Sequence, residues 1–107
     1  MSYVEAKYRE LLEEIESTRL RIAEFTAELQ GIEEALSRLE NLPDDAVLYE
    51  RAGHIYVRRT KEETLIDLKA RRNMLSSLIE ELKKKENRAR TELKQLVESV
   101  KAGEAGA

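Results

Sequence analysis

Apolar residues recur between residues 1 and 39 at alternating steps of three and four positions. The series is Met1, Val4, Tyr8, Leu11, Ile15, Thr18, Ile22, Phe25, Leu29, Ile32, Leu36 and Leu39. Its mean step of about 3.5 residues is typical of a left-handed coiled coil rather than of a helix on a globular core. Ser2 and Glu5 have the spacing of a capping box, and Pro43 disfavours helical geometry in the residue before it. The pattern therefore predicts one long helix over about residues 2–41.

The same alternation returns in the second half of the chain. Its members are Leu65, Leu68, Arg72, Leu75, Ile79, Leu82, Glu86, Ala89, Leu93, Leu96 and Val100. Thr60 and Glu63 form a second capping-box pattern, so a second helix is predicted over about residues 61–101. The Gly- and Ala-rich ending KAGEAGA predicts a flexible tail over residues 103–107.

The two series fit each other in one antiparallel register. When Leu39 faces Leu65, every step of three meets a step of three, outward to Val4 opposite Val100. The polar interruptions Thr18 and Glu86 then fall in one layer, and a polar layer helps to fix register. An intermolecular coiled coil stays open as an alternative, but a connection between two matched helices favours pairing within one chain.

Residues 46–59, AVLYERAGHIYVRR, break the helical pattern and predict a β-hairpin. Two runs rich in β-branched and aromatic residues flank Gly53: Val47, Leu48 and Tyr49 before it, and Ile55, Tyr56 and Val57 after it. Gly53 can supply the positive φ that a tight turn needs. The predicted fold is mainly α, a long antiparallel two-helix coiled coil with a β-hairpin at the connecting end, forming a single unit over residues 1–102.

The predicted hairpin requires partners. An isolated two-stranded hairpin is marginally stable in water, and alternation places apolar side chains on both of its faces. We therefore expect hairpins from several subunits to join in a sheet or barrel. The residues expected to carry this assembly are Val47, Leu48, Tyr49, Gly53, Ile55, Tyr56 and Val57. The alternative is that the hairpin folds back on its own helices, which would hide one face at most.

Composition supports long, solvent-exposed helices. Charged residues make up 38% of the 107 residues and aromatic residues 5%, and a compact globule would have fewer charges. The net charge of −3 is spread along both halves, which does not favour nucleic-acid binding. No stretch approaches the roughly 20 apolar residues of a membrane span. The N-terminus also lacks the apolar core of a signal peptide, so we expect a cytoplasmic protein without membrane contact.

Candidate chemistry is sparse. The chain has no cysteine and a single histidine, His54, and no glycine-rich phosphate loop. Asp45, Glu50 and His54 could approach a metal ion, but a structural or solvent-facing His54 is the favoured interpretation. We therefore expect no catalytic residues, no metal and no cofactor.

The segment LPDDAVLYERAGHIYVRRTKEETLIDL resembles the central region of archaeal prefoldin beta subunits. The matching features are Leu42-Pro43-Asp44-Asp45, Tyr49, Gly53, Val57 and Thr60-Lys61-Glu62, with heptad helices on each side. The resemblance implies a non-enzymatic, ATP-independent chaperone subunit. It also implies a heterohexamer of two alpha-type and four beta-type subunits that holds unfolded client proteins at coiled-coil tips and passes them to a group II chaperonin.

The free helix ends are the predicted client-binding tips, at the far end of the helices from the hairpin. The candidates are Met1, Tyr3, Val4, Tyr8, Val97 and Val100. Tyr3 and Val97 lie outside the heptad seam and are expected to be exposed, whereas the seam residues can equally serve helix packing. Two other interpretations stay open. The chain could be a non-chaperone scaffold subunit of a prefoldin-like complex, or an RNA-binding helical hairpin that uses Arg71-Arg72 and residues 83–90.

Overall fold

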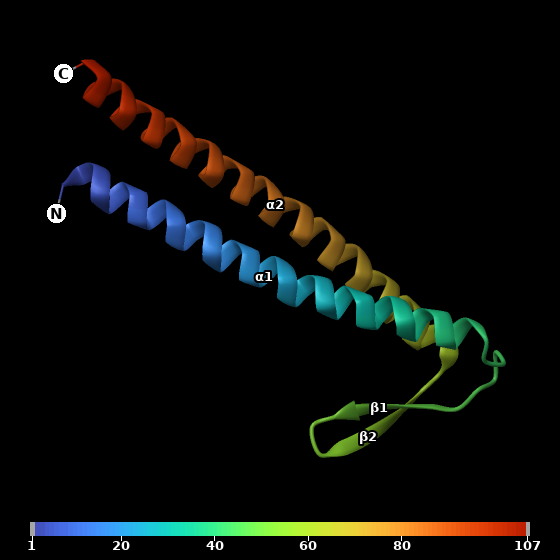
Figure 1. Ribbon diagram of the computed structural model, residues 1–107. Helices are drawn as coiled ribbons and strands as arrows, with labels where there is room; N and C mark the ends of the chain where they lie inside the picture. The colour runs from blue at the N-terminus through green and yellow to red at the C-terminus, as the bar shows by residue number, and fades with distance from the viewer. Residues whose placement is uncertain (1, 107) are drawn as a thin grey trace. The chain divides into compact units, whose positions relative to one another are not determined.

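The computed structural model describes residues 2–106 of the chain. The element order is α1 (Tyr3–Glu40), β1 (Leu48–Ala52), β2 (Ile55–Arg59) and α2 (Lys61–Gly106), as Figure 1 shows. Two long helices with a two-stranded antiparallel hairpin between them confirm the predicted fold class. The chain divides into two compact units, residues 1–25 with 78–107 and residues 26–77, and each contains a segment of both helices.

Both helices begin at the predicted capping residues. The backbone N–H of Glu5 donates to the Ser2 hydroxyl oxygen at 3.2 Å, and that of Glu63 donates to the Thr60 hydroxyl oxygen at 3.1 Å. The Thr60 hydroxyl also lies 3.1 Å from a carboxylate oxygen of Glu63. Each side-chain oxygen satisfies one N–H that has no partner within its helix, which places the helix starts at Tyr3 and Lys61.

α2 continues to Gly106, beyond the expected end near residue 101. Ala102 and Ala105 lie in this last stretch of the helix, and alanine has the highest helix propensity of all residues, which offsets part of the cost of the glycines. The flexibility predicted for residues 103–107 stays a prediction, and residue 107 lies outside the described residues.

In the unit formed by residues 1–25 and 78–107, the segments of α1 and α2 run antiparallel (Figure 1). Leu11, Ile15 and Ala89 form its buried apolar cluster, and Leu93 and Leu96 pack against that cluster. All five occupy heptad positions. Their grouping agrees with the register that pairs Ile15 with Ala89 and Leu11 with Leu93.

A polar layer interrupts the seam of this unit. Thr18 is 2% exposed, and the Glu86 side chain is 16% exposed. The Arg19 Nε donates to a Glu86 carboxylate oxygen at 2.7 Å and so joins the two helices beside Thr18. Shifting the helices would move these polar groups against apolar neighbours, so the layer opposes a change of register.

The unit formed by residues 26–77 has its own buried seam. Ile32, Leu36, Leu39 and Leu75 are buried, and Leu75 is fully so. A guanidinium nitrogen of Arg71 on α2 lies 2.7 Å from a carboxylate oxygen of Glu28 on α1, beside the seam. The four buried positions are again those of the heptad series.

The strands pair antiparallel, with Ala52 opposite Ile55, so Gly53 and His54 form a two-residue turn. Gly53 has φ +63°, whereas His54, like every other described non-glycine residue, has a negative φ. Positive φ at the first of two turn residues is the φ pattern of a type II′ hairpin, which favours glycine there. The predicted role of Gly53 in the turn is confirmed.

The expectation that Val47 belongs to the first strand is wrong. The last strand pair joins Leu48 to Arg59, so the residue opposite Val47 would be Thr60. Thr60 instead accepts the N–H of Glu63 and begins α2. Because Thr60 caps the helix, the strand pairing stops at Leu48 and does not reach Val47, which precedes β1 and is 50% exposed.

Candidate functional site: the hairpin and the helix ends

One face of the hairpin carries two exposed tyrosines. Tyr49 pairs with Arg58 and Tyr56 with Arg51, so the four side chains alternate on one face. Tyr49 is 66% exposed and Tyr56 is 69% exposed. Aromatic rings are large apolar groups with one polar atom, and such side chains are enriched in protein interfaces.

The other face carries aliphatic side chains. Ile55 and Val57 lie on it with Leu48, because their strand partners alternate in the same phase. Ile55 is 63% exposed and Val57 is 41% exposed, whereas Leu48 is half-buried. Among the described residues the sheet has only these two strands, so each strand has one unpaired edge. Both faces thus expose apolar groups, as the sequence predicted.

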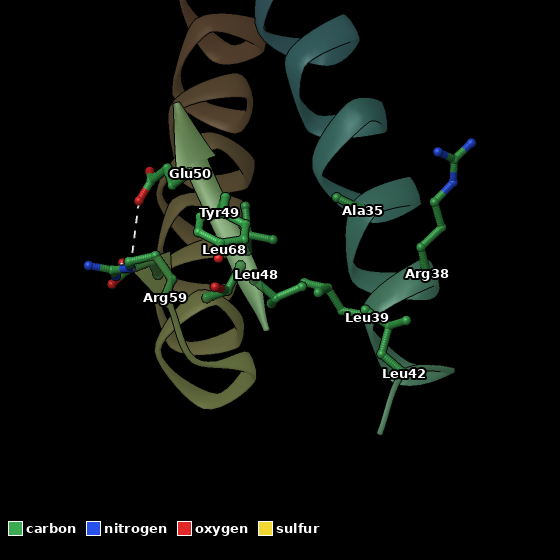
Figure 2. A pocket seen from close by; sticks show the side chains of 11 residues that line it. Ala35, Arg38, Leu39, Leu42, Leu48, Tyr49, Glu50, Arg59 and Leu68 are labelled. Carbon is green, nitrogen blue, oxygen red and sulfur yellow. Dashed lines mark hydrogen bonds and ion pairs between the residues drawn. The ribbon is translucent and has the colours of Figure 1, made fainter. Parts of the chain in front are cut away.

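Leu48 is the point at which the hairpin meets the helices of its own unit. A cavity of about 370 Å³ lies there, with an apolar lining that includes Leu39, Leu42, Leu48 and Leu68. In Figure 2, Leu39 extends from α1 toward Leu48, while the guanidinium end of Arg38 points away from the other lining side chains. The hairpin therefore packs against its own helices at Leu48, at the base of one face. Ile55 and Val57 on the same face, and the tyrosines on the other face, stay exposed.

An ionic cluster surrounds Arg59 at the base of β2. Its guanidinium Nε lies 3.6 Å from a carboxylate oxygen of Glu50 on β1 and 3.6 Å from one of Glu63 on α2. Its Nη2 also pairs with Asp67, one turn farther along α2. Nearby, the Lys61 ammonium donates to the carbonyl oxygen of Leu42 at 2.8 Å. Arg59 thus ties both strands to the first turns of α2.

The helix ends expose a second set of predicted residues. Tyr3 is 79% exposed, and Val4, Tyr8 and Val100 are each close to 40% exposed. Tyr3 is exposed as expected for a residue outside the seam. Val97 differs, because it is partly buried and lines two grooves of this unit. Met1 lies outside the described residues.

Apolar side chains contribute to both of the grooves that Val97 lines. The smaller groove, of about 320 Å³, is lined by Val4, Tyr8, Leu96, Val97, Val100 and Lys101. The larger groove, of about 500 Å³, has Leu12, Ile15, Leu93 and Val97 among its lining residues. Sequence reasoning missed Leu12, which is 39% exposed. The available signal was that Leu12 and Val97 each follow a seam leucine directly, which widens the apolar stripe on that side.

The residues proposed for metal chemistry do not come together. Among the described side chains, those of residues 2–103, no group of three His, Asp or Glu could hold a metal ion. Glu50 instead pairs with Arg59, and His54 is an exposed turn residue. Within the same range, no helix has the length and apolar character that crossing a bilayer requires.

Three comparisons place this arrangement among known proteins. A family model described as "Prefoldin subunit" matches residues 4–103. Prefoldin subunit beta of Caldivirga maquilingensis is 30% identical over 104 residues, which cover 94% of this chain and 86% of that protein. Prefoldin subunit beta of Pyrobaculum calidifontis is 30% identical over 94 residues, covering 88% and 75%. The crystal structure of the prefoldin beta subunit from Thermococcus strain KS-1 shares the fold, with a TM-score of 0.85 at 24% identity and coverage of 96% and 93%.

Proposed function

This chain belongs to the prefoldin subunit family, and we propose that it is a beta-type subunit of an ATP-independent chaperone for unfolded proteins. In this proposal the hairpin joins the chain to an alpha-type subunit and to further copies of itself, in a heterohexamer of two alpha-type and four beta-type subunits. The helix ends hold an unfolded client, prevent its aggregation and release it to a group II chaperonin. The role requires no catalytic residue and no cofactor.

The hairpin supports the assembly step. Tyr49, Tyr56, Ile55 and Val57 expose apolar surface on both faces of a sheet whose edges are unpaired. Burying apolar surface stabilises an interface by about 25 cal/mol per Å², and an edge strand adds backbone hydrogen bonds to it. Hairpins of neighbouring subunits can supply both the apolar contacts and the backbone hydrogen bonds.

The helix ends support the holding step. Their grooves present apolar side chains and no strand edge, so contacts there impose little geometry on a client. Tyr3 and Tyr8 add rings with a polar tip, which suits a surface that meets both water and apolar segments. Each contact would be weak, and several helix ends on one assembly would raise affinity through effective concentration.

The observation that carries the proposal is the exposure of apolar side chains in two regions of different kind. The hairpin combines them with unpaired strand edges, which favours specific assembly. The helix ends offer grooves between side chains, which favours permissive binding. A passive scaffold would need only the first of these regions.

Native mass measurement followed by an aggregation assay tests the proposal. The chain is measured alone and with an alpha-type prefoldin subunit, and the same sample is then mixed with a chemically denatured client. We expect an oligomer that suppresses light scattering by the client. A stable lone protomer at micromolar concentration, even with the alpha-type subunit present, would contradict the assembly step. An oligomer that leaves scattering unchanged would identify a scaffold instead.

Truncation separates the two steps. Removing residues 1–8 together with residues 96–107 deletes every residue that lines the smaller groove. We expect the oligomer to keep its number of subunits and client holding to weaken. Removing only residues 103–107 is the matched control and should leave both unchanged. Loss of the oligomer in the first truncation would contradict this division of roles.

A further inference from the structure

The lining of the larger groove at the helix ends has an excess of basic side chains. Beside its apolar residues, it is lined by four cations, Arg19, Arg90, Lys94 and Lys101, and by one carboxylate, Glu98. The Arg19 guanidinium already has a partner, because its Nε donates to a Glu86 carboxylate oxygen at 2.7 Å. No ion pair is formed by Arg90, Lys94, Lys101 or Glu98 within the part of the chain whose side chains are described. Among the described side chains, three cations without an ion pair thus line the groove together with one carboxylate.

The charge of this groove is local. The chain as a whole carries a net charge of −3. A third groove of the same unit, of about 250 Å³, is lined in part by Tyr3, Lys7, Leu11 and Glu92. There the Lys7 ammonium lies 3.9 Å from a Glu92 carboxylate oxygen, so the two charges cancel. One flank of the helix ends is therefore neutral and the other is cationic.

We propose that the larger groove, called here the cationic groove, selects segments of unfolded clients that carry carboxylates among apolar side chains. The inference rests on the proposed function and names the class of client that this surface prefers. Apolar side chains of the segment would cover Leu12, Leu93 and Val97, and its carboxylates would pair with Arg90 and Lys94 at the rim. Free cations also disfavour basic segments, so the groove discriminates by repulsion as well as attraction.

Matched peptides test the preference on the assembled complex with full-length chains. The probes are fluorescein-labelled peptides of leucine alternating with glutamate, with glutamine or with lysine. We expect the glutamate peptide to bind roughly fivefold more tightly than the glutamine peptide at low salt, as two exposed ion pairs would give. The lysine peptide should bind most weakly. In 1 M salt, where charges are screened beyond about 3 Å, the three affinities should converge.

Paired variants assign the preference to the groove. Arg90→Gln with Lys94→Gln should abolish the advantage of the glutamate peptide. Lys83→Gln with Lys84→Gln is the control, because it removes the same charge from exposed α2 residues that line none of these grooves. Val97→Ser should weaken all three peptides by a similar factor. Circular dichroism and native mass verify that each variant is folded and assembled.

Three outcomes would overturn, in turn, the peptide preference, the role of the groove and the proposed function. Equal binding of the glutamate and glutamine peptides, by a complex that still suppresses client aggregation, would overturn the preference and leave the proposed function intact. Equal loss of preference in the control variant would assign it to overall charge and overturn the role of the groove. Failure to bind any peptide or to suppress aggregation would overturn the proposed function itself.

Discussion

The hairpin and the helix ends both expose apolar side chains, but they differ in what else they offer a partner. The hairpin adds unpaired backbone N–H and C=O groups along its two edges, and these accept only another strand in a defined register. Along the helices most backbone groups pair within the helix, so the grooves at the helix ends offer mainly side chains to a partner. Tyr49 and Tyr3 are similarly exposed, yet only Tyr49 lies on a strand with an unpaired edge.

This difference explains how one chain can combine a specific interface with a permissive one. Backbone pairing fixes direction and register, which an assembly of defined composition needs. Side-chain grooves fix neither, so segments of many sequences can occupy them. The regions can be separated experimentally, because substitutions in one should leave the function of the other intact.

The largest effect is expected from removing aliphatic surface from the hairpin. Ile55→Ser with Val57→Ser should destabilise each hairpin interface by about 3 kcal/mol, since burying such a side chain contributes about 1.5–3 kcal/mol. That is a loss of roughly a hundredfold in the equilibrium constant of each interface. Native mass as a function of concentration measures it.

Leu20→Ser with Met74→Ser is the matched control for this variant. Leu20 is 61% exposed and Met74 is 50% exposed, close to the values for Ile55 and Val57, but both lie on helices. The control should assemble like the natural chain. If both double variants assembled normally, the hairpin would have no special role and the comparison between the regions would fail.

The next effect concerns the turn of the hairpin. Gly53→Ala adds a methyl group that meets no atom within 4 Å, so its cost comes from placing alanine at φ +63°. A left-handed conformation costs about 1–2 kcal/mol for a residue with a Cβ. We expect the midpoint of assembly to move to higher protein concentration, with helical content unchanged.

Gly31→Ala adds the same methyl group, also without a neighbour within 4 Å, but in the interior of α1. Alanine favours a helix over glycine by about 1 kcal/mol, so this variant should be more stable to denaturant than the natural chain. Opposite signs for the two variants would confirm that the conformation of Gly53 is the cause. A stabilising Gly53→Ala would contradict the positive φ.

The heptad seam and the turn could be predicted from sequence because each depends on nearby residues. Leu11, Ile15, Leu36 and Leu75 are buried where the alternation of threes and fours places them. A coiled coil repeats one local rule, so the rule can be extended along the chain. Gly53 likewise marks a turn that involves only its neighbours.

Other features could not be predicted because they depend on distances between separate elements. The start of β1 at Leu48 rather than at Val47 follows from the cap at Thr60, because Thr60 would be the strand partner of Val47. The partial burial of Val97 and the groove beside it depend on how two helix segments of one unit are spaced, which a heptad does not specify. The cluster at Arg59 requires knowledge of how far each side chain reaches.

A smaller effect is expected where the hairpin is attached to α2. Arg59→Gln removes the cation between three carboxylates, and the Arg59 side chain is 26% exposed, so solvent screens part of the loss. We expect a destabilisation of about 1 kcal/mol in urea unfolding, shrinking as salt is added. Arg58→Gln is the control on the tyrosine face, with no ion pair among the described residues. Equal effects of the two variants would exclude a role for the cluster.

The smallest effects distinguish two ion pairs of the unit that carries the helix ends. Arg19 and Glu86 meet at 2.7 Å with Glu86 largely buried, whereas Lys7 and Glu92 meet at 3.9 Å and are more exposed. Double-mutant cycles with glutamine should give a coupling energy of about 0.5–1 kcal/mol for the first pair and near zero for the second. Since the second pair borders the groove that contains Tyr3, a coupling near zero would indicate that this end of the seam is held by apolar contacts alone. If the Lys7–Glu92 coupling equalled that of Arg19–Glu86, the longer distance and greater exposure of the Lys7–Glu92 pair would not weaken it, and an ionic contact would help to hold this end of the seam.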